Sequence, residues 1–189
     1  MHTRPLILIV AALASGTALL TTESAPATKR VTVRISGGHA TDARDGGRPV
    51  RLIAAALGVP EQVFRDAFSA VTPAAGGSEP DPAQVQRNKA ALLKALAPYG
   101  VTNERLDEVS DYYRYSGSAG EIWRRRAAVA KATIANGRVV AVTLVSGGAG
   151  YSSAPTVTVP GYATKLKVRL AYGTDLATNG RVRSIAVAR

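Results

Sequence analysis

Residues 131–146 read KATIANGRVVAVTLVS, and this stretch decides the fold of the second half of the chain. Two runs rich in Val, Ile and Thr flank Asn136-Gly137, and both residues of this pair tolerate the positive φ of a two-residue hairpin turn. From about Ala127 onward the chain is rich in Val, Thr, Gly and Tyr. We therefore predict a small antiparallel β-sheet of four to five strands in residues 128–189.

A short repeat organises this second half. Residues 136–139, NGRV, recur as residues 179–182, and residues 146–159 between them read SGGAGYSSAPTVTV. This segment resembles the G-x-G-Y-x-x-x-P-x-V-x-V β-repeat of bacterial surface and phage tail-type proteins, over about residues 130–160. The resemblance implies a structural or display unit without catalytic residues. The turn residues that we expect to shape the region are Asn136, Gly137, Gly147, Gly148, Gly150, Tyr151, Asn179 and Gly180.

Residues 28–127 are expected to be mainly helical after one N-terminal strand at residues 31–35. Apolar residues at helical spacing, punctuated by Pro and Gly, predict about four helices, at residues 49–57, 60–71, 82–97 and 102–113. The predicted class is α+β. We expect the helices to cover one face of the sheet, because neither part looks large enough to close a core alone. This helical part is similar only to uncharacterised secreted bacterial proteins.

The N-terminus has the pattern of a secretory signal peptide. Arg4 precedes an almost wholly apolar run at residues 6–20, which is short for a membrane-spanning helix of about 20 residues. Ala25-Pro26-Ala27 supplies a small-x-small cleavage motif, so we place a signal peptide at residues 1–27. The protein is then secreted, into the periplasm or the medium of a bacterium, with no membrane span after cleavage. An uncleaved anchor is the alternative.

Composition limits the chemistry that the chain can perform. The 189 residues are 46% hydrophobic and contain no cysteine, which excludes disulfides, thiolate zinc sites, cysteine nucleophiles and iron–sulfur clusters. We expect no cofactor. The formal net charge is +11, and removing residues 1–27 leaves it unchanged because Arg4 and Glu23 leave together. Such a charge favours polyanionic partners.

One polar loop is a candidate metal or catalytic site. His39, Asp42 and Asp45 recur every third position just before a predicted helix, and Asp42 and Asp45 are the candidate ligands of a divalent cation. Alternatively, the two carboxylates pair with Arg44 or Arg48, or cap the helix.

A second candidate is an aromatic–basic surface for a sugar polymer or polyanion. Aromatic side chains alternate with a run of cations there, and the candidate binding residues are Tyr112, Tyr115, Trp123, Arg124, Arg125 and Arg126. The alternative places Tyr112 and Tyr113 in the core, with a wet hydroxyl end, and the arginines in a solvated stretch.

Residues 52–68 have near helix-turn-helix spacing, with a small residue at Ala54, a glycine at Gly58 and an apolar residue at Phe64. DNA binding is disfavoured, because Glu61 and Asp66 would face phosphates and because export removes the chain from DNA. The first hypothesis is an exported, non-enzymatic structural or interaction protein whose basic surface binds an anionic envelope component or a protein partner. A secreted enzyme or metal-binding protein using the His39 loop, and a DNA-binding protein, are the alternatives.

Overall fold

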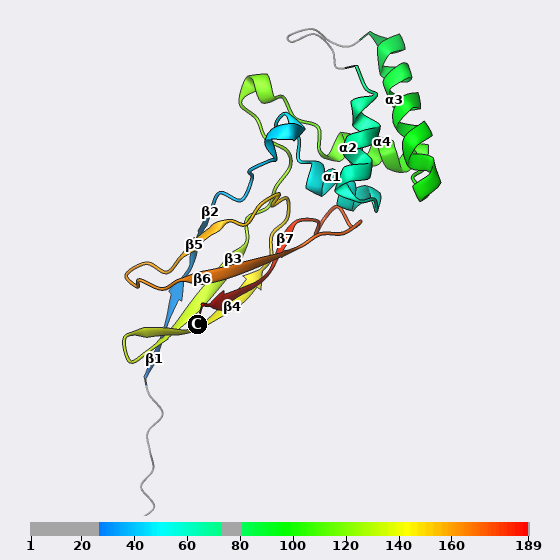
Figure 1. Cartoon of the computed structure of the whole chain (residues 1–189). Coiled ribbons are helices and arrows are strands. Elements are labelled where there is room, and N and C mark those ends of the chain that lie inside the picture. Colours follow the sequence, from blue (N-terminus) through cyan, green and yellow to red (C-terminus); the bar gives the residue numbers. More distant parts are fainter. Residues whose placement is uncertain (1–26, 73–80, 189) are drawn as a thin grey trace, which may run out of the picture.

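The computed structural model describes residues 27–72 and 81–188, and these form an α+β fold, as the sequence predicts (Figure 1). The helices are α1 (Val50–Leu57), α2 (Glu61–Ser69), α3 (Pro82–Leu96) and α4 (Asn103–Tyr112). The strands are β1 (Thr28–Thr32), β2 (Arg34–Ser36), β3 (Val129–Ala135), β4 (Arg138–Ser146), β5 (Thr156–Thr158), β6 (Leu166–Ala171) and β7 (Arg181–Val187). The expected signal segment falls almost wholly on residues 1–26, which lie outside the described residues.

Local chemistry sets the ends of the helices. Asp81 caps α3 by accepting a hydrogen bond from the N–H of Ala83, and Thr102 caps α4 in the same way. Gly58 ends α1 in the left-handed conformation, with φ of 73°, which glycine adopts without steric cost. The predicted helices at residues 49–57, 82–97 and 102–113 therefore begin and end within about one residue of the observed bounds.

The strands form three small antiparallel sheets rather than the single sheet that the sequence predicts. The strand orders are β1-β3-β4, β2-β5 and β6-β7. Both longer hairpins contain register shifts, for example between Arg169 and Leu170, and such bulges bend a strand and increase its twist. The short, bent strands therefore curl around a common core instead of lying in one open sheet.

Two hydrophobic cores divide the molecule. One cluster joins the helices and includes Leu52, Leu96 and Val109, whereas the other joins the strands and includes Ala132 and Val182. Figure 1 shows the four helices gathered at one end of the elongated strand assembly. The expectation that they cover a sheet face is therefore wrong, because the inner faces of the three sheets already cover one another.

These two parts are named by their residues from here on. Residues 37–72 and 81–123 are the helical region, and residues 27–36 and 124–188 are the β region. Within the described ranges, no helix combines the length and the apolar character that crossing a bilayer demands.

Candidate functional site

The loop that leads into α1 uses both of its carboxylates to bind arginine. Asp42 accepts hydrogen bonds from the backbone N–H of Arg44 at 3.0 Å and from its guanidinium at 2.7 and 3.0 Å. The Arg44 side chain, and then its backbone N–H, lower the pKa of the Asp42 carboxyl group. Asp45 is 4% exposed and accepts hydrogen bonds from Nε and Nη2 of Arg65 at 2.7 and 3.0 Å. The geometry thus favours the alternative in which this loop pairs with arginine.

His39 contacts aromatic rings instead of these carboxylates. The centroid of its ring lies 5.4 Å from that of Tyr151 and 6.1 Å from that of Trp123. Burial, and then the charge of Arg125, lower the pKa of His39. In the part of the chain that the structure describes, no three His, Cys, Asp or Glu side chains are grouped so that they could hold a metal ion. The expected ligands and the histidine are therefore committed to other contacts.

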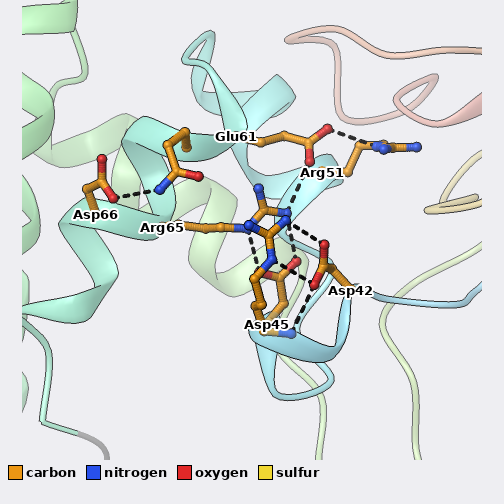
Figure 2. A network of polar contacts seen from close by, with 8 residues as sticks. Asp42, Asp45, Arg51, Glu61, Arg65 and Asp66 are labelled. Carbon is orange, nitrogen blue, oxygen red and sulfur yellow. Dashed lines mark hydrogen bonds and ion pairs between the residues drawn. The ribbon is translucent and has the colours of Figure 1, made fainter.

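A hollow of about 350 Å³ lies beside the loop and is lined by arginines. Figure 2 shows how they are engaged: Arg65 reaches Glu61 at 3.2 Å as well as Asp45, and Glu61 accepts a second hydrogen bond from Nε of Arg51 at 2.8 Å. Each of these carboxylates faces a guanidinium. The network joins the loop to α1 and α2 and is nearly balanced in charge, which suits a structural role better than ligand capture.

The expected aromatic–basic surface is wrong for Trp123. This side chain is only 3% exposed, and its Nε1–H donates a hydrogen bond to the carbonyl of Gly150 at 2.9 Å. Its ring meets that of Tyr115 edge-on at 5.8 Å between centroids, and the Tyr115 hydroxyl donates to the carbonyl of Gly47. Trp123 is thus a buried link between the two regions. The sequence pattern misses this because a tryptophan followed by three arginines looks exposed.

The neighbouring arginines remain on the surface. Arg124 lies 4.9 Å over the ring of Tyr112, and Nη2 of Arg126 donates to the carbonyl of Ala177 at 2.9 Å. Arg125 is exposed as well. Of the six expected binding residues, the structure therefore brings Arg124 and Tyr112 into direct contact and leaves the three cations accessible.

The glycine-rich segment at residues 146–151 brings two segments of the β region into close contact. Its residue Ala149 forms a β-bridge with Arg126, and the Tyr151 hydroxyl accepts a hydrogen bond from the N–H of Ala128 at 2.9 Å. A Cβ on Gly150 would lie 2.6 Å from the carbonyl oxygen of Arg124, closer than real Cβ atoms come to backbone. The glycines are therefore required for close approach of two chain segments.

The two NGRV copies occupy different environments. Asn136 has φ of 49° in the tight turn between β3 and β4. Asn179 instead lies at the end of the long loop before β7 and is 1% exposed. Its Nδ2 donates to the carbonyl of Leu52 at 2.7 Å and to the Tyr113 hydroxyl at 2.8 Å, and its Oδ1 accepts from the N–H of Gly173 at 3.2 Å.

The contacts of Asn179 with Leu52 and Tyr113 join the two regions, and we call this interface the seam. The sequence pattern did not predict it. Burial raises the pKa of Tyr113 to about 12, although the hydrogen bond with Asn179 acts in the opposite direction. Arg105 of α4 adds to the seam by donating to the carbonyls of Ala56 and Thr174. The only sequence signal near Asn179 was the recurrence of NGRV. That recurrence suggests two similar turns, whereas the second asparagine is buried and connects the two regions.

Charge is distributed very unequally between the two regions. The β region contains one acidic residue, Asp175, and its basic residues are Lys29, Arg30, Arg34, Arg124, Arg125, Arg126, Lys131, Arg138, Lys165, Lys167, Arg169, Arg181 and Arg183. The ion pairs found among the described residues all lie in the helical region. The cations of the β region are exposed and have no carboxylate within ion-pair distance in that same set of residues.

The two helices of the predicted helix-turn-helix present little positive charge. On α2, Nε2 of Gln62 donates to Asp66 at 2.7 Å, and Arg65 is committed to Asp45 and Glu61. A helix that reads DNA approaches a dense array of phosphates. An exposed carboxylate at Asp66 and an occupied arginine at position 65 do not suit that task.

Comparisons of the chain with protein-family models, with curated proteins and with solved structures found no match. Function must therefore be inferred from the charge and geometry of the chain itself.

Proposed function

We propose that this protein is an exported, non-enzymatic interaction protein that binds an anionic polymer through its β region. The observation that carries the proposal is the exposed, unpaired positive charge of that region, set against a single acidic residue. Cations that lack carboxylate partners produce a positive potential that attracts polyanions and accelerates their encounter. An anionic component of a bacterial envelope has the required chemistry.

The helical region shows that the unpaired charge is not a general property of the chain. There, Lys89 lies 2.7 Å from Asp107 and Arg114 lies 2.7 Å from Asp111, as ordinary surface ion pairs. If the protein is exported, the expected cleavage after Ala27 would leave a chain that begins with β1 at Thr28. A mature N-terminus at Thr28, found by mass spectrometry of exported protein, is the expected result. Intact protein retained in the cytosol would contradict export.

Binding is tested with dextran sulfate and with uncharged dextran in about 0.15 M salt, where the Debye length is about 8 Å. We expect binding to the sulfated polymer alone, with an affinity that falls linearly in a double-logarithmic plot against salt. A quadruple variant, Arg30→Thr, Lys131→Thr, Lys167→Thr and Arg169→Thr, removes β-region charge from strands without removing buried groups. It should bind at least about 50-fold more weakly, since each cation near an anionic surface contributes about 1 kcal/mol.

A matched control comes from the helical region. Arg87 and Lys94 are exposed on α3, so the double variant Arg87→Gln, Lys94→Gln removes cations without changing the β region. It should retain affinity to within a few-fold. Equal losses per charge in the two variants would show only non-specific attraction, and an unchanged quadruple variant would refute the proposal.

A further inference from the structure

The outward face of the β6–β7 hairpin gathers cations in two neighbouring rows. Lys167 and Arg169 lie on β6, Arg181 and Arg183 lie on β7, and all four are exposed. Lys165 directly precedes β6 and is exposed too. Residues two apart on a strand share a face and are separated by about 6.7 Å, so the β6 row with Lys165 spans about 13 Å. Figure 1 shows β6 and β7 side by side along the β region.

The register gives most of these cations small, uncharged partners across the hairpin, and Asp175 is the one nearby carboxylate of the β region, close to Arg181. Lys167 faces Ala186 across the hairpin, and Arg169 faces Ser184. Arg181 faces Ala171, whereas Arg183 is the extra residue at the register shift between the Arg169–Ser184 and Leu170–Val182 pairs and therefore lies next to Arg169. Like charges placed directly opposite would destabilise the hairpin. Lys167 and Arg181 thus have small partners across the hairpin, and Arg169 and Arg183 concentrate positive charge at the bulge.

The shape of this face suits binding to a linear polymer rather than to a flat membrane surface. Two-stranded ribbons are the most strongly twisted of sheets, and the register shift between Arg169 and Leu170 increases the twist further. A flexible linear polymer can follow a twisted ribbon, whereas a bilayer surface contacts only part of it.

The remaining side chains of the face argue against a membrane and against nucleic acid bases. Between the cations lie Ala171, Ser184 and Ala186, while the larger apolar residues such as Leu170 and Ile185 point to the core. Membrane-surface binding relies on apolar side chains that enter the lipid boundary. Single-stranded nucleic acids are held by aromatic stacking, and none of the residues on the two strands is aromatic.

We infer that the outward face of β6 and β7, with Lys165, is the binding site for a flexible linear polyanion bearing sulfate or phosphate groups, laid along the ribbon. This inference deepens the proposed function and rests on it. The arginines offer planar donor pairs that match tetrahedral oxyanions, and the lysines add point charges. Affinity arises from several modest contacts along the polymer rather than from one deep pocket.

The experiment divides the quadruple variant into two matched pairs. Lys167→Thr with Arg169→Thr removes one Lys and one Arg from the hairpin face, and Arg30→Thr with Lys131→Thr removes the same types from the outer face of the β1-β3-β4 sheet. In 0.15 M salt, the hairpin pair should weaken dextran sulfate binding about thirtyfold and lower the salt slope by about two. The sheet pair should change affinity less than threefold.

Each other outcome overturns the inference in a distinct way. Equal losses in the two pairs would leave the proposed function intact but place binding over the whole β region. Sucrose octasulfate, a compact polyanion, should bind much more weakly than dextran sulfate, and equal binding would indicate a point site instead of a ribbon. Tighter binding to phosphatidylglycerol vesicles than to the polymer would indicate a membrane surface. If the hairpin pair aggregates while its monomer binds normally, the cations serve only to keep β6 from edge pairing.

Discussion

The helical region and the β region differ in whether their charged side chains form ion pairs. In the helical region Asp45, 4% exposed, holds Arg65, and exposed pairs such as Arg114 with Asp111 recur on α4. The β region keeps its cations on outward-facing positions and its core free of charge. One region therefore uses charge to hold its own segments together, and the other leaves its charge available to a partner.

The two regions meet at a seam of backbone and amide contacts that does not depend on ion pairs between them. Asn179 reaches Leu52 and Tyr113 across it, and the Nε1–H of Trp123 donates to the Gly150 carbonyl at 2.9 Å. Such contacts are insensitive to salt, whereas ion pairs are screened. Binding of a polyanion at the proposed site on the β region would therefore leave these contacts to the helical region in place.

The largest effect should come from adding one methyl group inside the β region, where the glycine-rich segment packs against the backbone of residues 126–128. A Cβ on Gly148 would meet the backbone of Arg126, Ala127 and Ala128, and its φ of 63° is unfavourable for any side chain. Gly148→Ala should lower the free energy of unfolding by about 3–5 kcal/mol, from strain and overpacking together, as measured by urea denaturation. The control is Gly137→Ala, where φ is 73° but nothing lies within 4 Å. It should cost only about 1 kcal/mol, and similar costs at both sites would contradict a close approach of the glycine-rich segment to residues 126–128.

The two asparagines of the repeated motif provide the next comparison. Asn179→Ala leaves the Leu52 carbonyl, the Tyr113 hydroxyl and the Gly173 N–H without this partner, so we expect a loss of about 2–3 kcal/mol. Asn136→Ala affects only the exposed turn between β3 and β4, and should cost about 1 kcal/mol for its left-handed backbone. Thermal unfolding of both variants measures the difference. A smaller loss at position 179 than at 136 would mean that the side-chain contacts across the seam contribute little.

A buried ion pair and an exposed one test how charge acts inside the helical region. Asp45→Ala removes the main partner of Arg65, which is only 17% exposed at its side chain, and should cost about 2 kcal/mol because Glu61 still holds the guanidinium. Asp111→Ala removes half of a pair exposed at 76% and 70% and should cost under about 0.5 kcal/mol. Urea titrations of both variants at low and high salt measure the loss in the free energy of unfolding. Equal costs would remove the distinction between structural and surface pairs.

What the sequence predicted correctly was local, and what it missed was long-range. The bounds of α1, α3 and α4 follow the prediction to within about one residue, because the residues that set them, Asp81, Thr102 and Gly58, act within a turn of the helix ends. The buried hydrogen bond of Asn179 depends on Leu52, which lies far away in the chain. No residue near position 179 predicts that contact. Burial of Trp123 is likewise set by Gly150. The positive charge of the chain was visible in the sequence, but its segregation required knowing which carboxylates pair with which cations.

The smallest effect concerns pH and the same seam. His39 is half-buried against Tyr151 and Trp123, and burial, followed by the charge of Arg125, lowers its pKa in the folded protein below the ordinary value of 6.5. The unfolded state therefore binds the proton more readily, and stability should fall as pH drops from about 7.5 through 6.5 and level off below the folded pKa. His39→Phe keeps a ring at the seam and cannot take up a proton, so its stability should change less over the same range. Melting temperatures at pH 7.5 and 5.5 compare the two proteins in a window above the ordinary carboxylate pKa values. An identical pH response in both would show that the histidine is as free to ionise at the seam as in the unfolded chain.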